Sequence, residues 1–136
     1  MKKIIISILA LVVAVTIMSC SDGDSSVYYN GYVAMEAGPL PDTMHLNTTY
    51  TFSLIASASN SCWHNLEFLY NNSVDSVYSY AASGVFENNG ETCEQDMVVK
   101  DTTIVFTPEE LKTLIFRFYS YGAIDRVDTV VVVEAE

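Results

Sequence analysis

Two histidines, His45 and His64, are the chain's entire supply of imidazole for acid–base, nucleophilic or metal chemistry. The sequence has no HExxH, GxSxG, Walker A or CxxC pattern, so it lacks the working parts of zinc hydrolases, α/β-hydrolases, P-loop NTPases and thioredoxin-like enzymes. A Ser-His-Asp set can still form in space, because geometry defines a triad and sequence order does not. We therefore expect a protein that is not an enzyme, with a small cell-envelope hydrolase as the alternative.

Cys62 and Cys93 lie 31 residues apart and could form a disulfide. In an oxidising compartment, closing such a loop contributes about 3 to 4 kcal/mol in the chain-entropy model. A buried pair of free thiols is one alternative. A metal site is another, but it would need His64 as third ligand and would still lack a fourth. We expect the disulfide, no metal and no cofactor.

The first twenty residues indicate the compartment. Lys2 and Lys3 precede an almost wholly apolar segment, residues 4–17, which would rise only about 21 Å as a helix and is too short to span a membrane. The segment ends in Ile-Met-Ser-Cys, which resembles a bacterial lipobox, where cleavage precedes a lipid-bearing cysteine. This predicts a signal peptide at residues 1–19, a lipidated tether at 20–26 and one domain at 27–136. An ordinary signal peptide beside a free thiol is the alternative.

Lipidation of Cys20 also explains an odd number of cysteines in an exported chain, because it leaves Cys62 and Cys93 as an even pair. Two or more acyl chains hold a protein stably on a membrane. Asp22 and Asp24 loosely resemble the acidic export signals of Bacteroidota surface lipoproteins. We expect an outer membrane lipoprotein of the cell envelope, periplasmic or surface-facing.

The charge of the mature chain excludes some partners. All 17 carboxylates follow Cys20 and only four Lys and Arg residues oppose them, which leaves a net charge of −13 with His neutral. Such a surface repels phosphate backbones, so we expect no nucleic-acid partner. Residues 87–96 gather four acidic side chains but lack EF-hand spacing, which favours a solvated loop.

Nine tyrosines are many for a chain of this length, and some of them could form a binding surface. If Leu114 and its alternating neighbours face inward, Arg117, Tyr119 and Tyr121 share the outward face, and exposed Tyr with Arg is typical of binding hot spots. Tyrosines also simply pack across strands. The candidate partner is an unknown protein or glycan.

Four triplets resemble the Bacteroidota O-glycosylation pattern of Asp, then Ser or Thr, then a residue such as Val, Met or Thr. The candidate acceptors are Thr43, Ser76, Thr102 and Thr129. Sandwich architecture also produces such triplets, because Asp ends turns and β-branched residues begin strands. An occupied site should lie at an exposed strand end or turn.

Period-two alternation predicts the strands that would position these residues. The expected strands cover residues 27–36, 49–57, 66–70, 77–81, 97–106, 113–122 and 126–134. Thr107 and Pro108 begin "TPEEL", which carries the signals of a helix start and predicts one helical turn at residues 107–111. About seven short strands in one domain predict an all-β protein built as a single antiparallel sandwich.

The mature chain resembles small Ig-like β-sandwich lipoproteins of Bacteroidota, many of unknown function. The resemblance rests on the lipobox, on Cys62 and Cys93, and on "VFTPEELKTLIFRFYSY" followed by a valine-rich strand. Trp63 directly follows the first cysteine, unlike the tryptophan of antibody-type domains. The resemblance implies a membrane-anchored, non-catalytic binding or interaction module, with a structural accessory subunit of an outer-membrane complex as a further alternative.

Overall fold

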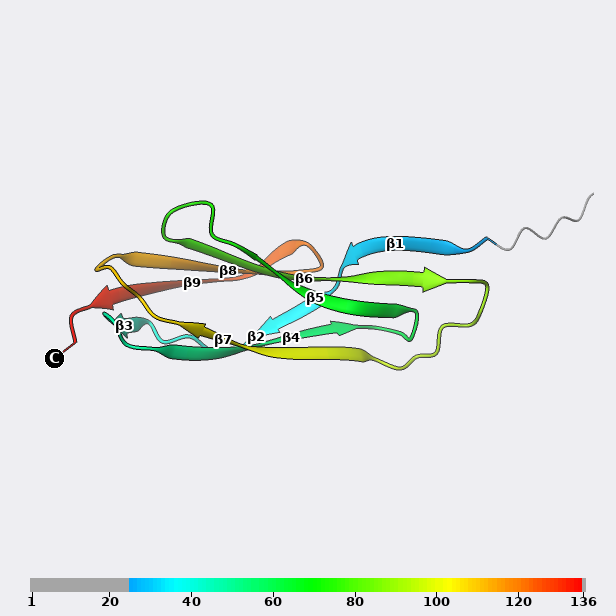
Figure 1. Cartoon of the computed structure of the whole chain (residues 1–136), viewed down its shortest axis with the longest axis horizontal. Coiled ribbons are helices and arrows are strands. Elements are labelled where there is room, and N and C mark those ends of the chain that lie inside the picture. Colours follow the sequence, from blue (N-terminus) through cyan, green and yellow to red (C-terminus); the bar gives the residue numbers. More distant parts are fainter. Residues whose placement is uncertain (1–24, 136) are drawn as a thin grey trace, which may run out of the picture.

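The computed structural model describes residues 25–135, which form nine β-strands and no helix. The strands are β1 (Val27–Tyr32), β2 (Ala34–Ala37), β3 (Thr43–His45), β4 (Tyr50–Ala58), β5 (Trp63–Asn71), β6 (Val77–Asn88), β7 (Val98–Phe106), β8 (Thr113–Ser120) and β9 (Ala123–Val133). Figure 1 shows them in two layers along the long axis of the molecule. The prediction of an all-β, sandwich-like fold is confirmed, with nine strands in place of about seven.

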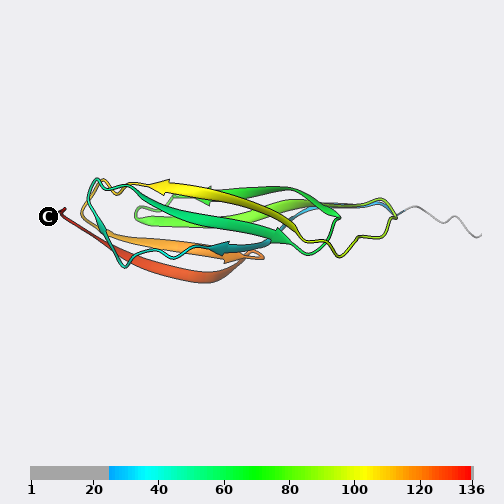
Figure 2. The ribbon, with the colours of Figure 1, turned by 90° about the horizontal axis from the view of Figure 1, so that it is seen from below.

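The larger sheet has six strands and the smaller has three. The larger follows the order β1-β6-β8-β9-β3, with β5 also paired to β6, and the smaller follows β2-β4-β7. Figure 2 shows β7, β4 and β2 side by side in the smaller sheet.

The predicted purely antiparallel Ig-like arrangement is wrong, because the larger sheet is mixed. β6 pairs with β8 in parallel, and β3 pairs with β9 in parallel. The chain leaves β6, runs along β7 in the other sheet and then returns as β8. This single passage through the opposite sheet brings the chain back in its original direction, so β8 lies parallel to β6.

The segment predicted as one strand at residues 27–36 is two strands in different sheets. Val33 lies at the crossing between β1 and β2 and is 1% exposed. Its N–H still donates to the carbonyl of Ala82 in β6, whereas Ala34 already pairs with Ser57 of β4. Burial of the valine fixes where the chain passes from one layer to the other.

The helical turn predicted at residues 107–111 is absent, and this segment forms a bend. Thr107 Oγ1 lies 2.9 Å from Thr49 Oγ1, and the carbonyl of Pro108 accepts the N–H of Asn47. Contacts with the β3–β4 connection therefore engage groups that a helical start would have used.

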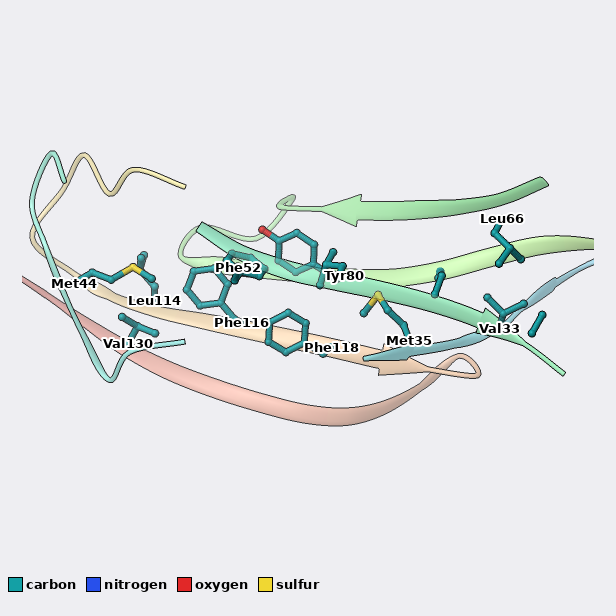
Figure 3. Packing of buried hydrophobic residues seen from close by; sticks show 14 of the residues in the cluster. Val33, Met35, Met44, Phe52, Leu66, Tyr80, Leu114, Phe116, Phe118 and Val130 are labelled. Carbon is teal, nitrogen blue, oxygen red and sulfur yellow. The ribbon is translucent and has the colours of Figure 1, made fainter. Parts of the chain in front are cut away.

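The core lies between the two sheets and centres on aromatic residues (Figure 3). Phe52 of β4 makes edge contacts with three rings of the larger sheet, those of Tyr80, Phe116 and Phe118. Phe116 and Phe118 are at most 1% exposed. Such pairs add about 0.5 to 1.5 kcal/mol each beyond area burial, so Phe52 couples the small sheet firmly to the large one.

Candidate functional site

The β8–β9 hairpin positions the residues that the sequence indicates for binding. Leu114, Phe116 and Phe118 are buried, as the alternation predicts. Arg117 and Tyr119 consequently point to the outer face of the larger sheet, where each is half-buried. The prediction of this register is confirmed for β8.

Tyr121 belongs to the turn and not to the strand. Tyr121 and Gly122 connect Ser120 to Ala123, and both have positive φ values, 51° and 77°, as a type I′ hairpin turn requires. Asn, Asp or Gly normally occupies the first of these positions, and a bulky side chain there is strained. The Tyr121 N–H donates to the carbonyl of Val33, which ties the turn to the β1–β2 crossing.

Tyr32, at the end of β1, packs on this turn. A Cβ atom built on Gly122 would lie 2.8 Å from Cδ2 of Tyr32, so the ring rests directly on the glycine backbone. Tyr32 is 55% exposed and was not singled out by the sequence. Its separation of 87 residues from Tyr119 leaves no local signal that the two lie near one another.

Tyr32 and Tyr119 line a groove with a volume of about 430 Å³ on the outer face of the larger sheet. Its other lining residues come from β5, β6 and the hairpin turn, and they are Leu69, Tyr70, Asn71, Ser79, Tyr80, Ala81 and Gly122. Asn71 and Ser79 are cross-strand partners and supply an amide and a hydroxyl. We call this set of residues the tyrosine groove.

The tyrosine groove has the chemistry of recognition. None of the described residues that line it is a carboxylate, an imidazole or a basic group. The ring of Tyr80 points into the core against Phe52 and Phe118, and burial, followed by the neighbouring Tyr70 and Tyr78, raises the pKa of its hydroxyl well above the usual value. Aromatic faces, hydroxyls and an amide can bind a ligand, but they offer no acid–base pair.

Arg117 lies beside the tyrosine groove, directly across the ladder from Ser79. Among the described residues, the other three Lys and Arg side chains are engaged: Lys100 donates to the carbonyl of Leu66, Lys112 pairs with Asp75 and Glu110, and Arg126 pairs with Asp128. Within residues 25–135, no such contact involves the guanidinium of Arg117. Its charge is available to a partner.

The histidines lie apart from the tyrosine groove. His45 Nδ1 is 3.2 Å from the carbonyl oxygen of Glu134, and His64 Nε2 is 3.5 Å from a Glu87 carboxylate oxygen. Ser61 lines the same hollow as His64 and Glu87, but its Oγ accepts the N–H of Glu94. No hydrogen bond joins Ser61 to His64 in the described part of the chain, so a catalytic triad is not assembled there.

Cys62 and Cys93 form a disulfide with a Cα–Cα distance of 5.3 Å, which confirms that prediction. The bond ties the start of β5 to the β6–β7 loop. Around it, Ser61 and Glu94 exchange a backbone hydrogen bond and an Oγ contact. The disulfide is typical of an oxidising, extracytoplasmic location. Among residues 25–135, no three potential metal ligands come together, including those of the acidic loop.

The candidate glycosylation sites occupy different environments. Thr43 begins β3 and is exposed, and Ser76 lies in the β5–β6 turn and is half-buried. Thr129 is exposed within β9, whereas Thr102 is half-buried in the middle of β7. Thr43 meets the requirement for an exposed strand end, whereas Ser76 lies in a turn but is half-buried.

Cys20, the signal peptide at residues 1–19 and most of the tether at 20–26 lie outside the described residues. No helix within residues 25–135 is long and apolar enough to cross a membrane. Comparisons with protein-family models, with curated proteins and with solved structures find no match to this chain.

Proposed function

We propose that this chain is a non-catalytic binding module, exported and held on the outer membrane by a lipid on Cys20. The observation that carries the proposal is the tyrosine groove, which is open on the outer sheet face and offers aromatic, amide and hydroxyl groups without an acid–base pair. The ligand is a glycan or a protein surface, because rings and apolar side chains pack on tyrosine faces while polar groups set the orientation.

The position of Arg117 supports this function. Tyr and Arg side chains supply much of the binding free energy at many protein interfaces. Although the chain is strongly acidic, the guanidinium of Arg117 forms no ion pair among the described residues. A carboxylate or hydroxyl on the ligand would complete its hydrogen bonding while the ligand lies against Tyr119.

The location is supported by two separate features. The lipobox-like "IMSC" places a cysteine where an acyl chain would be attached, and the disulfide is of the kind that persists outside the cytoplasm. The Ig-like lipoprotein of Bacteroidota type remains our proposal for the family, with the mixed sheet as a departure from the antibody arrangement.

Affinity capture from the native cell envelope, together with a glycan panel, tests the proposed function. The mature protein is compared with Tyr119→Ala, which truncates a wall of the groove, and with Val105→Ala on the outer face of the smaller sheet, where Val105 is 66% exposed. Loss of a hot-spot tyrosine weakens binding by about tenfold or more. We expect the captured ligand to be lost with Tyr119→Ala and kept with Val105→Ala.

The opposite pattern would contradict the proposal. A ligand that Tyr119→Ala captures as well as the unchanged protein does not bind in the tyrosine groove. Hydrolysis of a captured glycan or peptide by the purified protein would favour the small hydrolase instead.

A further inference from the structure

β1 has one free edge. It pairs only with β6, through Ser83–Asn88, and no other strand of the described residues pairs with it. β5 covers the opposite side of β6, so β1 and β8 share one side, β8 beside Val77–Tyr80 and β1 beside the second half. Figure 1 shows β1 at the upper margin of the molecule.

The free edge of β1 faces the same side of the sheet as the edge of β8 that pairs with β9. β9 lies on the far side of β8 and begins at Ala123, directly after the Tyr121–Gly122 turn. A hydrogen bond from the turn to Val33 holds it at the end of β1. Beside β8, the next strand position in the sheet is filled by β9. Beside β1, the same strand position is empty among the described residues. We call this position the open lane.

The register shows which backbone groups face the open lane. The N–H of Val33 donates to Ala82 of β6, and the N–H of Glu87 in β6 donates away from β1, to Cys62. Because N–H groups alternate in direction along a strand, the even-numbered residues of β1 point away from β6. The N–H and C=O groups of Tyr28, Asn30 and Tyr32 therefore face the open lane.

The other edge strands carry the features that prevent pairing, and β1 does not. β2 and β3 have only four and three residues, and β7 carries Lys100 and Asp101. β5 carries Glu67 and an irregular register after His64. β1 is six residues long, VYYNGY, with no charge and no proline. An edge of this kind is a template for an added strand.

The charge around the open lane favours a basic occupant. The N-terminal half of β1 lies opposite Asn88 and Glu87, whereas the disulfide and the Ser61–Glu94 hydrogen bonds hold the following acidic loop on the β5 side of β6. In the described part of the chain, no Lys or Arg forms an ion pair with any of these carboxylates. A second copy of this chain would bring the same net charge of −13 to the interface and would be repelled.

We propose that the open lane binds an extended, basic segment of a partner polypeptide as an added β-strand. The segment exchanges backbone hydrogen bonds with Tyr28, Asn30 and Tyr32, and its cations offset the charge of Glu87, the cross-strand partner of Tyr28, and of the acidic chain as a whole. This binding mode goes beyond the proposed function, because its site is the free edge of β1, which shares only Tyr32 with the tyrosine groove.

The probe is a peptide of about ten alternating Lys and Val residues, long enough to span β1. A peptide of alternating Glu and Val is the charge control. Amide hydrogen exchange of the mature protein is measured with and without each peptide. We expect the Lys/Val peptide to protect the amides of Tyr28, Asn30 and Tyr32 and to leave those of Tyr29 and Gly31 unchanged, since these already face β6.

Asn30→Pro removes an N–H that faces the open lane and no hydrogen bond to β6, whereas Asn30→Thr keeps that N–H. We expect Asn30→Pro to weaken binding of the Lys/Val peptide at least about tenfold, because proline cannot donate to an added strand. Asn30→Thr should bind within about twofold of the unchanged protein. Tyr119→Ala should also bind normally, which separates this site from the groove.

Several results would overturn the proposal. They are absent binding or absent protection at the three amides, equal binding of the Glu/Val peptide, and unchanged affinity of Asn30→Pro. Protection that rises with protein concentration without peptide would assign the edge to a second copy. If Asn30→Pro does not fold, the protection pattern of the unchanged protein decides the matter by itself.

Discussion

At the scale of single residues, Tyr121 shows the cost of a bulky side chain in a tight turn. Its φ of 51° lies in the left-handed region, where a bulky side chain is disfavoured, yet it is 68% exposed and contributes no core packing. Strain kept at an exposed aromatic residue beside a groove is consistent with a binding role.

The Tyr121→Asn variant should therefore be more stable. Asn-Gly is the preferred pair for a type I′ turn, so we expect the free energy of unfolding to rise by about 0.5 to 1 kcal/mol. Urea denaturation measures this change. Unchanged or lower stability would mean that Tyr121 makes a compensating contact, and ligand binding measured on the same variant would show whether its ring takes part.

Tyr80 gives a pH prediction. Burial raises the pKa of its hydroxyl in the folded state, so the folded protein favours the protonated form. The stability linked to this residue is complete below the unfolded pKa of about 10 and is lost as pH rises from there toward the folded-state pKa. Urea denaturation as a function of pH should show a smaller alkaline loss for Tyr80→Phe, with similar stability near pH 7. An alkaline loss equal to that of the unchanged protein would contradict the assignment.

At the scale of elements, two glycines explain how β1, β5 and β6 pack together. Gly31 and Gly84 are cross-strand partners, and the Trp63 ring lies against both. A Cβ at Gly84 would meet Leu66 Cδ2 at 2.7 Å and Trp63 Cε3 at 3.3 Å. The missing side chains make room for the tryptophan, whose ring also contacts those of Tyr29 and Phe86.

Gly84→Ala should destabilise the protein by about 1 to 3 kcal/mol, because the added methyl overfills a packed site. Ser83→Ala is the matched control, since this neighbour points to the outer face and the change should fall within about 0.5 kcal/mol. Urea denaturation of both variants measures the difference. Equal stabilities would show that Trp63 and Leu66 move aside freely.

The accuracy of the sequence-based prediction varies by element for physical reasons. Strands such as β4 and β8 alternate clearly and lie where predicted, because each has one buried face. The part of β6 beyond Ala81 begins Ala-Ser-Gly and shows no such signal, but β1 and β5 flank it and make it a strand. The parallel pairs and the contribution of Tyr32 to the groove depend on segments far apart in the chain, which local patterns do not report.

At the scale of the whole molecule, the disulfide secures the end of the sandwich that carries the acidic loop. The paired substitutions Cys62→Ser and Cys93→Ser release a loop of 31 residues, and we expect the free energy of unfolding to fall by about 3 to 4 kcal/mol. Urea denaturation of this variant and of the reduced unchanged protein should agree. A change below about 1 kcal/mol would mean that the strand pairs alone hold this end.

Attachment to the membrane belongs to the same scale. Metabolic labelling with a fatty-acid analogue should label the unchanged protein, and Cys20→Ala should lose both the label and the membrane fraction, because one acylated cysteine is the proposed anchor. Label that persists in Cys20→Ala would refute the anchor.

Intact mass of the native protein, after subtraction of the lipid, tests the glycosylation sites, and a mass without hexose-sized surplus would exclude them.

The placement of β1 has a mechanical consequence. The chain enters the fold at Val27, and β1 runs along the long axis of the molecule (Figure 1). If the chain is anchored at Cys20 as proposed, a pull on a ligand bound in the groove would apply a force to the β1–β6 pair parallel to the two strands. All its hydrogen bonds then bear the force together instead of opening one after another. The first strand of this protein would thus transmit force in shear between the proposed lipid anchor and the bound partner.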